Sequence, residues 1–111
     1  MSGKKSIKYN IKISDFFLEE LDEICGYFSD NFKSVYISDN FRKKSKMLIK
    51  NLKYFPRKYA VISKKDKNGR YFRRIILNNF IILYTIISEN SIIFISRIFY
   101  GKMDYFNSNF I

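Results

Sequence analysis

The stretch YFRRIILNNFIILYTIISENSIIFISRIFY, residues 71–100, decides the fold of this 111-residue chain. It contains three apolar runs, at 71–77, 80–87 and 92–100, in which β-branched and aromatic side chains dominate. Two short polar connections, at 78–79 and 88–91, separate the runs. Because strands joined by such short turns lie antiparallel to each other, the stretch predicts a three-stranded antiparallel meander.

A further strand is predicted near the N-terminus, at residues 7–13. Apolar and polar side chains alternate there, which is the pattern of a half-buried strand. The apolar face of this strand carries Ile7, Tyr9, Ile11 and Ile13.

Two helices are predicted between this strand and the meander. Ser14 and Asp15 offer an N-terminal cap to the first helix. The second runs from Ser34 to Tyr54, and Pro56 stops it. The polar connection between them is short, so the helices should form an antiparallel hairpin. The apolar stripe of the first helix is Phe17, Leu18, Leu21, Ile24, Cys25 and Phe28, and the seam of the second is Ser38, Phe41, Ser45, Leu48, Leu52 and Phe55.

Residues 57–70 form a basic loop with an Asn68-Gly69 turn signal and room for one short strand at 59–62. The order of elements is therefore a strand, a two-helix hairpin and a three-stranded meander, with all strands in one twisted sheet. This arrangement is an α+β fold. No repeat or linker divides the chain, so residues 1–111 are expected to form a single domain.

Cysteine and histidine usage excludes several kinds of site. Cys25 is the only cysteine and the chain has no histidine, which excludes an intrachain disulfide and histidine-based metal or catalytic sites. We expect no metal and no cofactor. No apolar stretch of signal-peptide length follows the basic N-terminus, so the expected location is the cytoplasm. Polar turns break the apolar region 75–96, which argues against a membrane span.

The positive charge is concentrated in one segment. The chain has 21 Lys and Arg against 10 acids, a net charge of +11, and residues 42–74 contain a single acid, Asp66. A solvated helix face is one interpretation of this pattern. The interpretation that we favour is a surface that binds a polyanion by releasing its counterions. The candidate binding residues are Arg42, Lys46, Lys50, Lys53, Arg57 and Lys58.

These features together resemble the RelE/ParE superfamily of bacterial toxins from type II toxin–antitoxin systems. The resemblance covers nearly the whole chain, from IKYNIKIS and FFLEELDEICGYF through a helix ending LKYFP to YFRRIILNNFIILYTI and IIFISRIFYGKMDY. It rests on the order and spacing of these segments. It implies a cognate antitoxin as partner, with a disordered segment that folds onto the toxin, and either DNA gyrase or ribosome-bound mRNA as target.

For the RNA-cutting branch of the superfamily, the resemblance implies a metal-independent endoribonuclease in which basic side chains stabilise the phosphate transition state. The candidate catalytic residues are Arg73, Arg74, Lys102 and Tyr105. Arg74 falls where a strand cation is expected, and Tyr105 can stand for a C-terminal tyrosine. Two further expected cations are replaced by Ile81 and Gly101. Their replacement leaves enzymatic activity open and favours binding over cleavage.

The ending from Arg97-Ile98 to Asp104-Tyr105 resembles the gyrase-blocking, ParE-like branch more closely. We therefore expect a growth-inhibiting toxin that acts by binding gyrase. The alternative is a ribosome-dependent mRNA interferase, and a second alternative is a non-toxic basic module that binds nucleic acid.

Structural roles compete with functional ones at several of these positions. Leu52, Phe55 and Tyr84 fit the core better than a site. Arg97 lies among apolar residues and has a possible ion-pair partner in Glu20 or Glu23 of the first helix.

Overall fold

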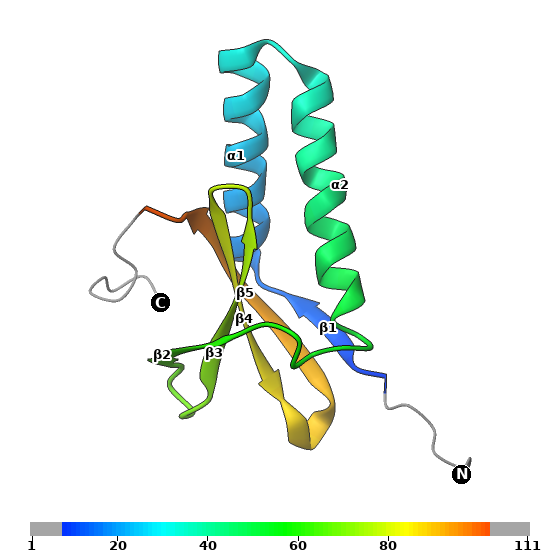
Figure 1. The fold of residues 1–111 in the computed structure, drawn as a ribbon, viewed down its shortest axis with the longest axis vertical. Coiled ribbons are helices and arrows are strands. Elements are labelled where there is room, and N and C mark those ends of the chain that lie inside the picture. Colours follow the sequence, from blue (N-terminus) through cyan, green and yellow to red (C-terminus); the bar gives the residue numbers. More distant parts are fainter. Residues whose placement is uncertain (1–7, 103–111) are drawn as a thin grey trace.

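The computed structural model describes residues 8–102. One sheet holds all five strands, in the order β1-β5-β4-β3-β2, and two helices stand beside each other against it (Figure 1). None of the helices in residues 8–102 is long and apolar enough to cross a membrane. The elements are β1 (Asn10–Ile13), α1 (Asp15–Phe32), α2 (Val35–Asn51), β2 (Val61–Lys65), β3 (Tyr71–Leu77), β4 (Phe80–Ile87), the 3-10 turn η1 (Ser88–Asn90) and β5 (Ile92–Tyr100).

Serine caps begin both helices. The Ser14 side chain accepts a hydrogen bond from the Phe17 amide at 3.0 Å, and Ser34 does the same for the Ile37 amide at 3.2 Å. These bonds satisfy amides that have no partner inside the helix. Lys33 takes a left-handed conformation, with φ of 48°, and reverses the chain between the helices. The antiparallel helical hairpin predicted from the sequence is confirmed (Figure 1).

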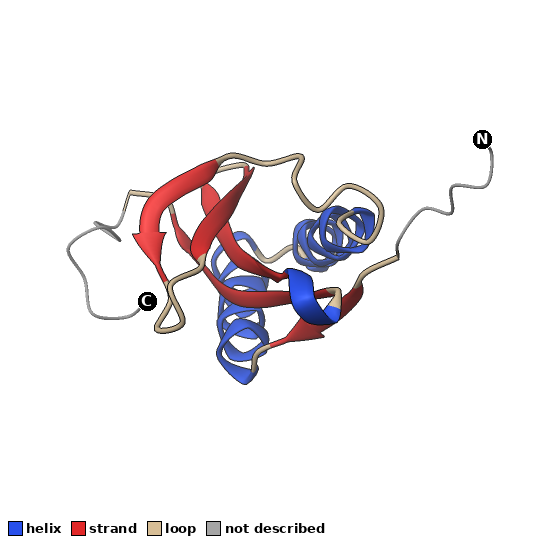
Figure 2. Ribbon diagram, turned by 90° about the horizontal axis from the view of Figure 1, so that it is seen from below, coloured by secondary structure: helices blue, strands red, loops and turns tan. Residues whose placement is uncertain are grey.

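The meander is confirmed, with β3, β4 and β5 beginning and ending at the predicted residues. The predicted meander and N-terminal strand give four strands, whereas the sheet has five. The fifth is β2, which pairs antiparallel with β3. Gly69, with φ of 82°, makes the turn between them, and Asp66 Oδ1 accepts hydrogen bonds from the amides of Asn68 and Arg70. Figure 2 shows how strongly the resulting sheet twists.

β1 joins the sheet parallel to β5, with Asn10 opposite Ile92 and Ile13 opposite Ile95. This places the N-terminal strand at one edge and β2 at the other. β1 is shorter than predicted, since it begins at Asn10, and Ile7 lies outside the described residues.

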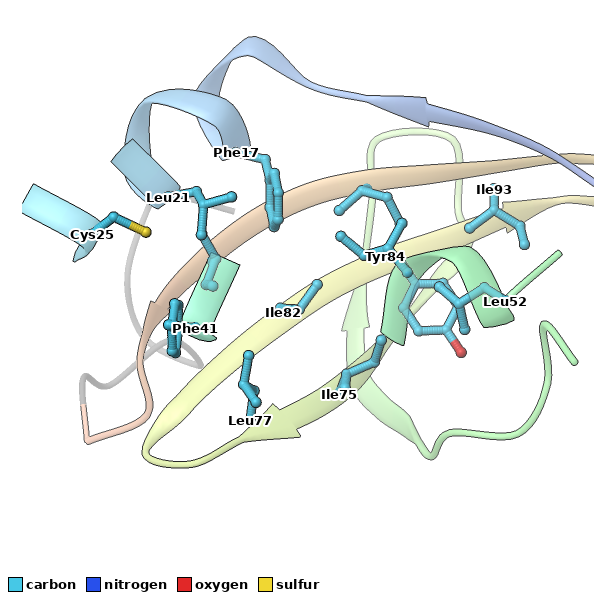
Figure 3. Close-up of a cluster of buried hydrophobic side chains, with 13 residues drawn as sticks. Phe17, Leu21, Cys25, Phe41, Leu52, Ile75, Leu77, Ile82, Tyr84 and Ile93 are labelled. Carbon is cyan, nitrogen blue, oxygen red and sulfur yellow. The ribbon is translucent and has the colours of Figure 1, made fainter. Parts of the chain in front are cut away.

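The main core lies between the helices and the sheet (Figure 3). Leu52 and Tyr84 are fully buried there, as predicted. Its other buried members are Phe17, Leu21, Cys25, Phe41, Ile49, Ile75, Leu77, Ile82, Ile93, Ile95 and Ile98. A smaller cluster covers part of the opposite sheet face and consists of Ile62, Phe72, Ile81, Leu83 and Phe99.

Three residues predicted on apolar, core-facing surfaces are exposed, and one of them is Leu18 of α1, at 47%. Ile13 is 42% exposed because β1 is an edge strand beside an open groove. Phe55 is 64% exposed because α2 ends at Asn51, so Phe55 leaves the helical seam to which the prediction assigned it. The prediction that Phe55 lies in the core is therefore wrong.

Candidate functional site

Three predicted binding residues lie along one groove. Lys46 and Lys50 are four residues apart and therefore lie on the same flank of α2, and Lys53 lies in the turn that directly follows the helix. They line a groove of about 250 Å³ that runs between α2, α1 and β1. Its remaining lining residues are apolar except for one serine: Ile11, Ile13, Phe17, Leu18, Leu21, Ser45 and Ile49. The groove thus combines an apolar floor with a rim of three ammonium groups.

Arg42, the first residue of the predicted basic row, has an acidic neighbour. Its Nη1 lies 3.0 Å from Asp22 Oδ1 of α1, and the two side chains are 36% and 70% exposed. An exposed pair of this kind contributes less than about 1 kcal/mol. Part of the charge of Arg42 is compensated by Asp22, unlike that of the lysines further along α2.

Arg57 and Lys58 lie on the loop that follows α2. The guanidinium of Arg57 donates to the hydroxyls of Tyr9 at 3.3 Å and Ser88 at 3.1 Å. Lys58 Nζ lies 5.5 Å from the centre of the Tyr59 ring. Hydroxyls and rings are neutral, and the ion pairs within residues 8–102 involve neither cation. Both side chains are exposed, so their charge faces solvent uncompensated.

Side chains of the sheet hold this loop from beneath. Tyr84 donates to the Pro56 carbonyl at 2.7 Å, and Arg73 Nη1 donates to the Tyr59 carbonyl at 2.7 Å. The Arg73 guanidinium also reaches the Arg57 carbonyl at 3.4 Å. Burial raises the pKa of Tyr84 to about 12, with the nearby Arg73 charge opposing the shift. Tyr84 therefore remains a protonated donor at neutral pH.

The predicted catalytic pair Arg73-Arg74 is divided by the sheet. Arg73 is opposite Tyr84 of the main core, whereas Arg74 is opposite Leu83 of the smaller cluster. Directly opposite residues share a face and successive residues alternate, so the two arginines point to opposite faces. Arg73 is committed to the loop backbone. The two candidate catalytic arginines thus lie on opposite faces of the sheet.

The two positions where expected cations are replaced lie next to each other. A Cβ added to Gly101 would lie 3.4 Å from the Ile81 side chain, and the Gly101 amide donates to the Asn79 carbonyl at 2.7 Å. Ile81 is buried in the smaller cluster. Lys102 follows this position and is exposed, and Tyr105 lies outside the described residues. This end of the sheet therefore offers Lys102 as a cation, with Ile81 and Gly101 apolar.

Arg97 has a structural partner. Its Nε and Nη2 donate to the Glu20 carboxylate at 2.6 to 3.0 Å, and the carboxylate also accepts the Ile98 amide at 3.1 Å. The side chains of Arg97 and Glu20 are only 19% and 20% exposed. The ion pair between β5 and α1 that the sequence suggested is confirmed with Glu20 as the acid.

Arg70 belongs to a second such network that the sequence did not predict. Its guanidinium lies 3.1 Å from Glu89 and 3.9 Å from Asp66. The amide of Glu89 itself and the guanidinium of Arg70 lower the pKa of the Glu89 carboxyl. Arg70 and Glu89 are 19 residues apart in sequence, so no local pattern signals their pairing.

Sequence reasoning also missed the apolar floor of the groove and the exposed aromatic ring of the loop. Ile11 and Ile13 alternate as core residues of any strand would, and Phe55 continues a helical spacing. The groove floor becomes apparent from the position of β1 at the edge of the sheet, and the exposed ring of Phe55 from the end of α2 at Asn51.

Comparison with known proteins agrees with this fold. The chain is similar to a chain of the archaeal RelE–RelB complex from Pyrococcus horikoshii OT3, at 15% identity and a TM-score of 0.55, over 86% of this chain and 97% of that one. It is also similar to a chain of the toxin–antitoxin complex RelBE2 from Mycobacterium tuberculosis, at 12% identity and a TM-score of 0.57, over 86% and 94%. At these identities the likeness concerns the fold. A comparison with curated proteins finds no match.

The family model described as ParE toxin of type II toxin–antitoxin systems matches residues 11–105. This range includes both helices, all of the sheet except Asn10, the groove and the loop. The chain belongs to the family of ParE toxins of type II toxin–antitoxin systems.

Proposed function

We propose that this toxin inhibits growth by binding DNA gyrase and that it does not cut RNA. The observation that carries the proposal is the apolar contact between Ile81 and the Gly101 position, where the RNA-cutting branch is expected to have cations. A phosphate transition state needs several donors that converge on it. Here the expected donors are replaced at two adjacent positions.

The remaining cations do not compensate for this replacement. Arg73 is on the other face of the sheet and bonds the loop backbone. Arg74 is opposite Leu83, and Lys102 follows Gly101, which bonds Asn79. From Asn79 to Leu83 the chain advances roughly 13 Å at the rise of a β-strand. Arg74 and Lys102 therefore start from well-separated points.

Binding is supported by the cations of α2 and the loop. Lys46, Lys50, Lys53 and Lys58 are in no ion pair within residues 8–102. Uncompensated ammonium groups on one side of a protein favour a polyanionic target, such as a topoisomerase with its bound DNA.

The test compares two assays on the same purified chain. Gyrase supercoiling of a relaxed plasmid should be inhibited, and mRNA in a translating extract should keep its original 5′ ends. Cleaved mRNA with unaffected supercoiling would support the interferase instead. In that case Arg74→Ala and Tyr105→Ala should abolish cleavage.

We also propose that the groove between α1, α2 and β1 receives a segment of the cognate antitoxin. Both solved relatives are complexes of a toxin with its antitoxin. An amphipathic acidic segment could place apolar side chains on Ile11, Ile13 and Leu18, and carboxylates against Lys46 and Lys50. Coexpression with the antitoxin gene should restore growth, and Leu18→Asp should prevent this rescue while leaving toxicity intact. Rescue of the Leu18→Asp variant to the wild-type level would move the antitoxin to another surface.

A further inference from the structure

We infer that the loop after α2 is a binding site for single-stranded nucleic acid, in which the Phe55 ring stacks on a base and the neighbouring cations bind phosphates. The inference extends the proposed function and rests on it only for the choice of DNA as the strand. It concerns a direct contact of this chain with a nucleic acid, so it can be tested without gyrase.

The first argument is that the loop is fixed while its most exposed ring, that of Phe55, faces water. The Pro56 side chain is buried and its carbonyl is held by Tyr84 at 2.7 Å. Backbone bonds fix the residues on each side, from the Phe55 amide to the Asn51 carbonyl and from the Lys58 amide to the Phe55 carbonyl, both at 3.2 Å. The Phe55 ring nevertheless remains 64% exposed. An ordered, exposed aromatic ring contributes little to folding and is typical of a contact residue.

The second argument is the charge around the ring. An open depression of about 510 Å³ is lined by Phe55, Pro56, Arg57 and Lys58. Arg57 is positioned by two neutral hydroxyls, so its place is fixed and its charge is kept. The sequence has no acid from residue 41 to residue 65. A phosphate approaching the ring therefore meets cations and no carboxylate from this segment.

The third argument concerns which polyanion fits. An aromatic platform flanked by cations matches a single strand, because each base offers an unstacked face and each linkage a phosphate. A duplex keeps its base faces covered and could use only the cations. An acidic peptide would likewise use the cations and leave the ring without a partner. Phe55 thus favours a single strand over both alternatives.

The test is fluorescence anisotropy with a labelled DNA strand of about 12 nucleotides and with the duplex of the same sequence. Phe55→Ala should weaken binding of the strand about tenfold and leave duplex binding nearly unchanged. Phe55→Trp should retain strand binding. Phe16→Ala is the matched control, since Phe16 is also 64% exposed but lies on α1 beside Arg97, and it should bind as the wild type does.

Charge is tested separately with Lys58→Ala. This variant should weaken strand and duplex alike and should reduce the dependence of affinity on salt. Equal strand affinity of the wild type and Phe55→Ala would overturn the inference. The inference would also be overturned if the wild type bound polyglutamate but not the DNA strand, and if Phe55→Ala weakened the binding of polyglutamate. Gyrase inhibition is scored in its own assay, so a wild-type protein that inhibits gyrase but does not bind the strand would reject this site and leave the proposed function standing.

Discussion

The arginines of the sheet and the cations of α2 and its following loop differ in what surrounds them. Arg97 is bound to a carboxylate of α1, and Arg73 is bound to carbonyls of the loop. Lys50, Lys53 and Lys58 have no acid partner within the described part of the chain. The comparison teaches that the count of 21 Lys and Arg overstates the number of cations available for binding. Burial and neighbouring groups decide whether a cation stabilises this fold or faces a target.

The largest effect is expected at Arg97. Arg97→Ala leaves Glu20 mostly buried without its ion-pair partner, which should lower the free energy of unfolding by about 3 kcal/mol. The matched control is Arg42→Ala, whose pair with Asp22 is exposed and should contribute less than about 1 kcal/mol. Urea unfolding of both variants measures the difference. If both variants lost the same free energy of unfolding, the difference between the buried Arg97 pair and the exposed Arg42 pair would have no effect on stability.

A smaller effect is expected at Arg73. Arg73→Ala removes the charged donor of the Tyr59 carbonyl and should lower the free energy of unfolding by about 2 kcal/mol. Lys43→Ala, at an exposed position of α2, should change it by less than about 0.5 kcal/mol. Thermal or urea unfolding decides between these values. A wild-type stability of the Arg73 variant would mean that this arginine does not hold the loop.

Of the three side chains that hold the sheet to α1 and to the loop, Tyr84 is expected to give the smallest change in stability. Tyr84→Phe removes only the hydroxyl and should lower the free energy of unfolding by about 1 kcal/mol at neutral pH. The folded pKa of Tyr84 is raised from 10.0 to about 12, so the folded state keeps the proton that the unfolded state loses. The contribution of Tyr84 to stability is therefore complete below pH 10 and is lost as the pH rises toward about 12.

Unfolding measured over this pH range separates Tyr84 from the other titrating groups. The difference in stability between wild type and Tyr84→Phe should shrink as the pH rises from 10.0 toward about 12. Parallel curves for the two proteins would show that the Tyr84 hydroxyl titrates alike in the folded and unfolded states.

The central sheet could be predicted from the sequence because its signals are local. The apolar runs of β3, β4 and β5 are bounded by polar turns, and both helices begin at a serine cap. The parallel pairing of β1 with β5 could not be predicted, since Asn10 and Ile92 meet from distant parts of the chain. β2 has a weak pattern of charged and apolar residues, and its pairing with β3 depends on the Gly69 turn.

The candidate site was predicted only in part. Lys46, Lys50 and Lys53 were among the predicted binding residues, and all three line the groove. Phe55 was assigned to the core because its spacing continued that of the seam, whereas the end of α2 at Asn51 turns it outward. Arg73 and Arg74 are neighbours in sequence, but the pleat of β3 puts their side chains on opposite faces of the sheet.

The most direct test of the account measures how much toxin gives half-maximal inhibition of gyrase supercoiling, using two variants that each lose two positive charges. One combines Lys53→Ala with Lys58→Ala beside the loop, and the other combines Arg74→Ala with Lys102→Ala near the Gly101 end of the sheet. We expect the loop variant to need at least about tenfold more protein than the wild type, and the sheet variant to match the wild type. Wild-type inhibition by the loop variant, together with loss of inhibition by the sheet variant, would contradict the account.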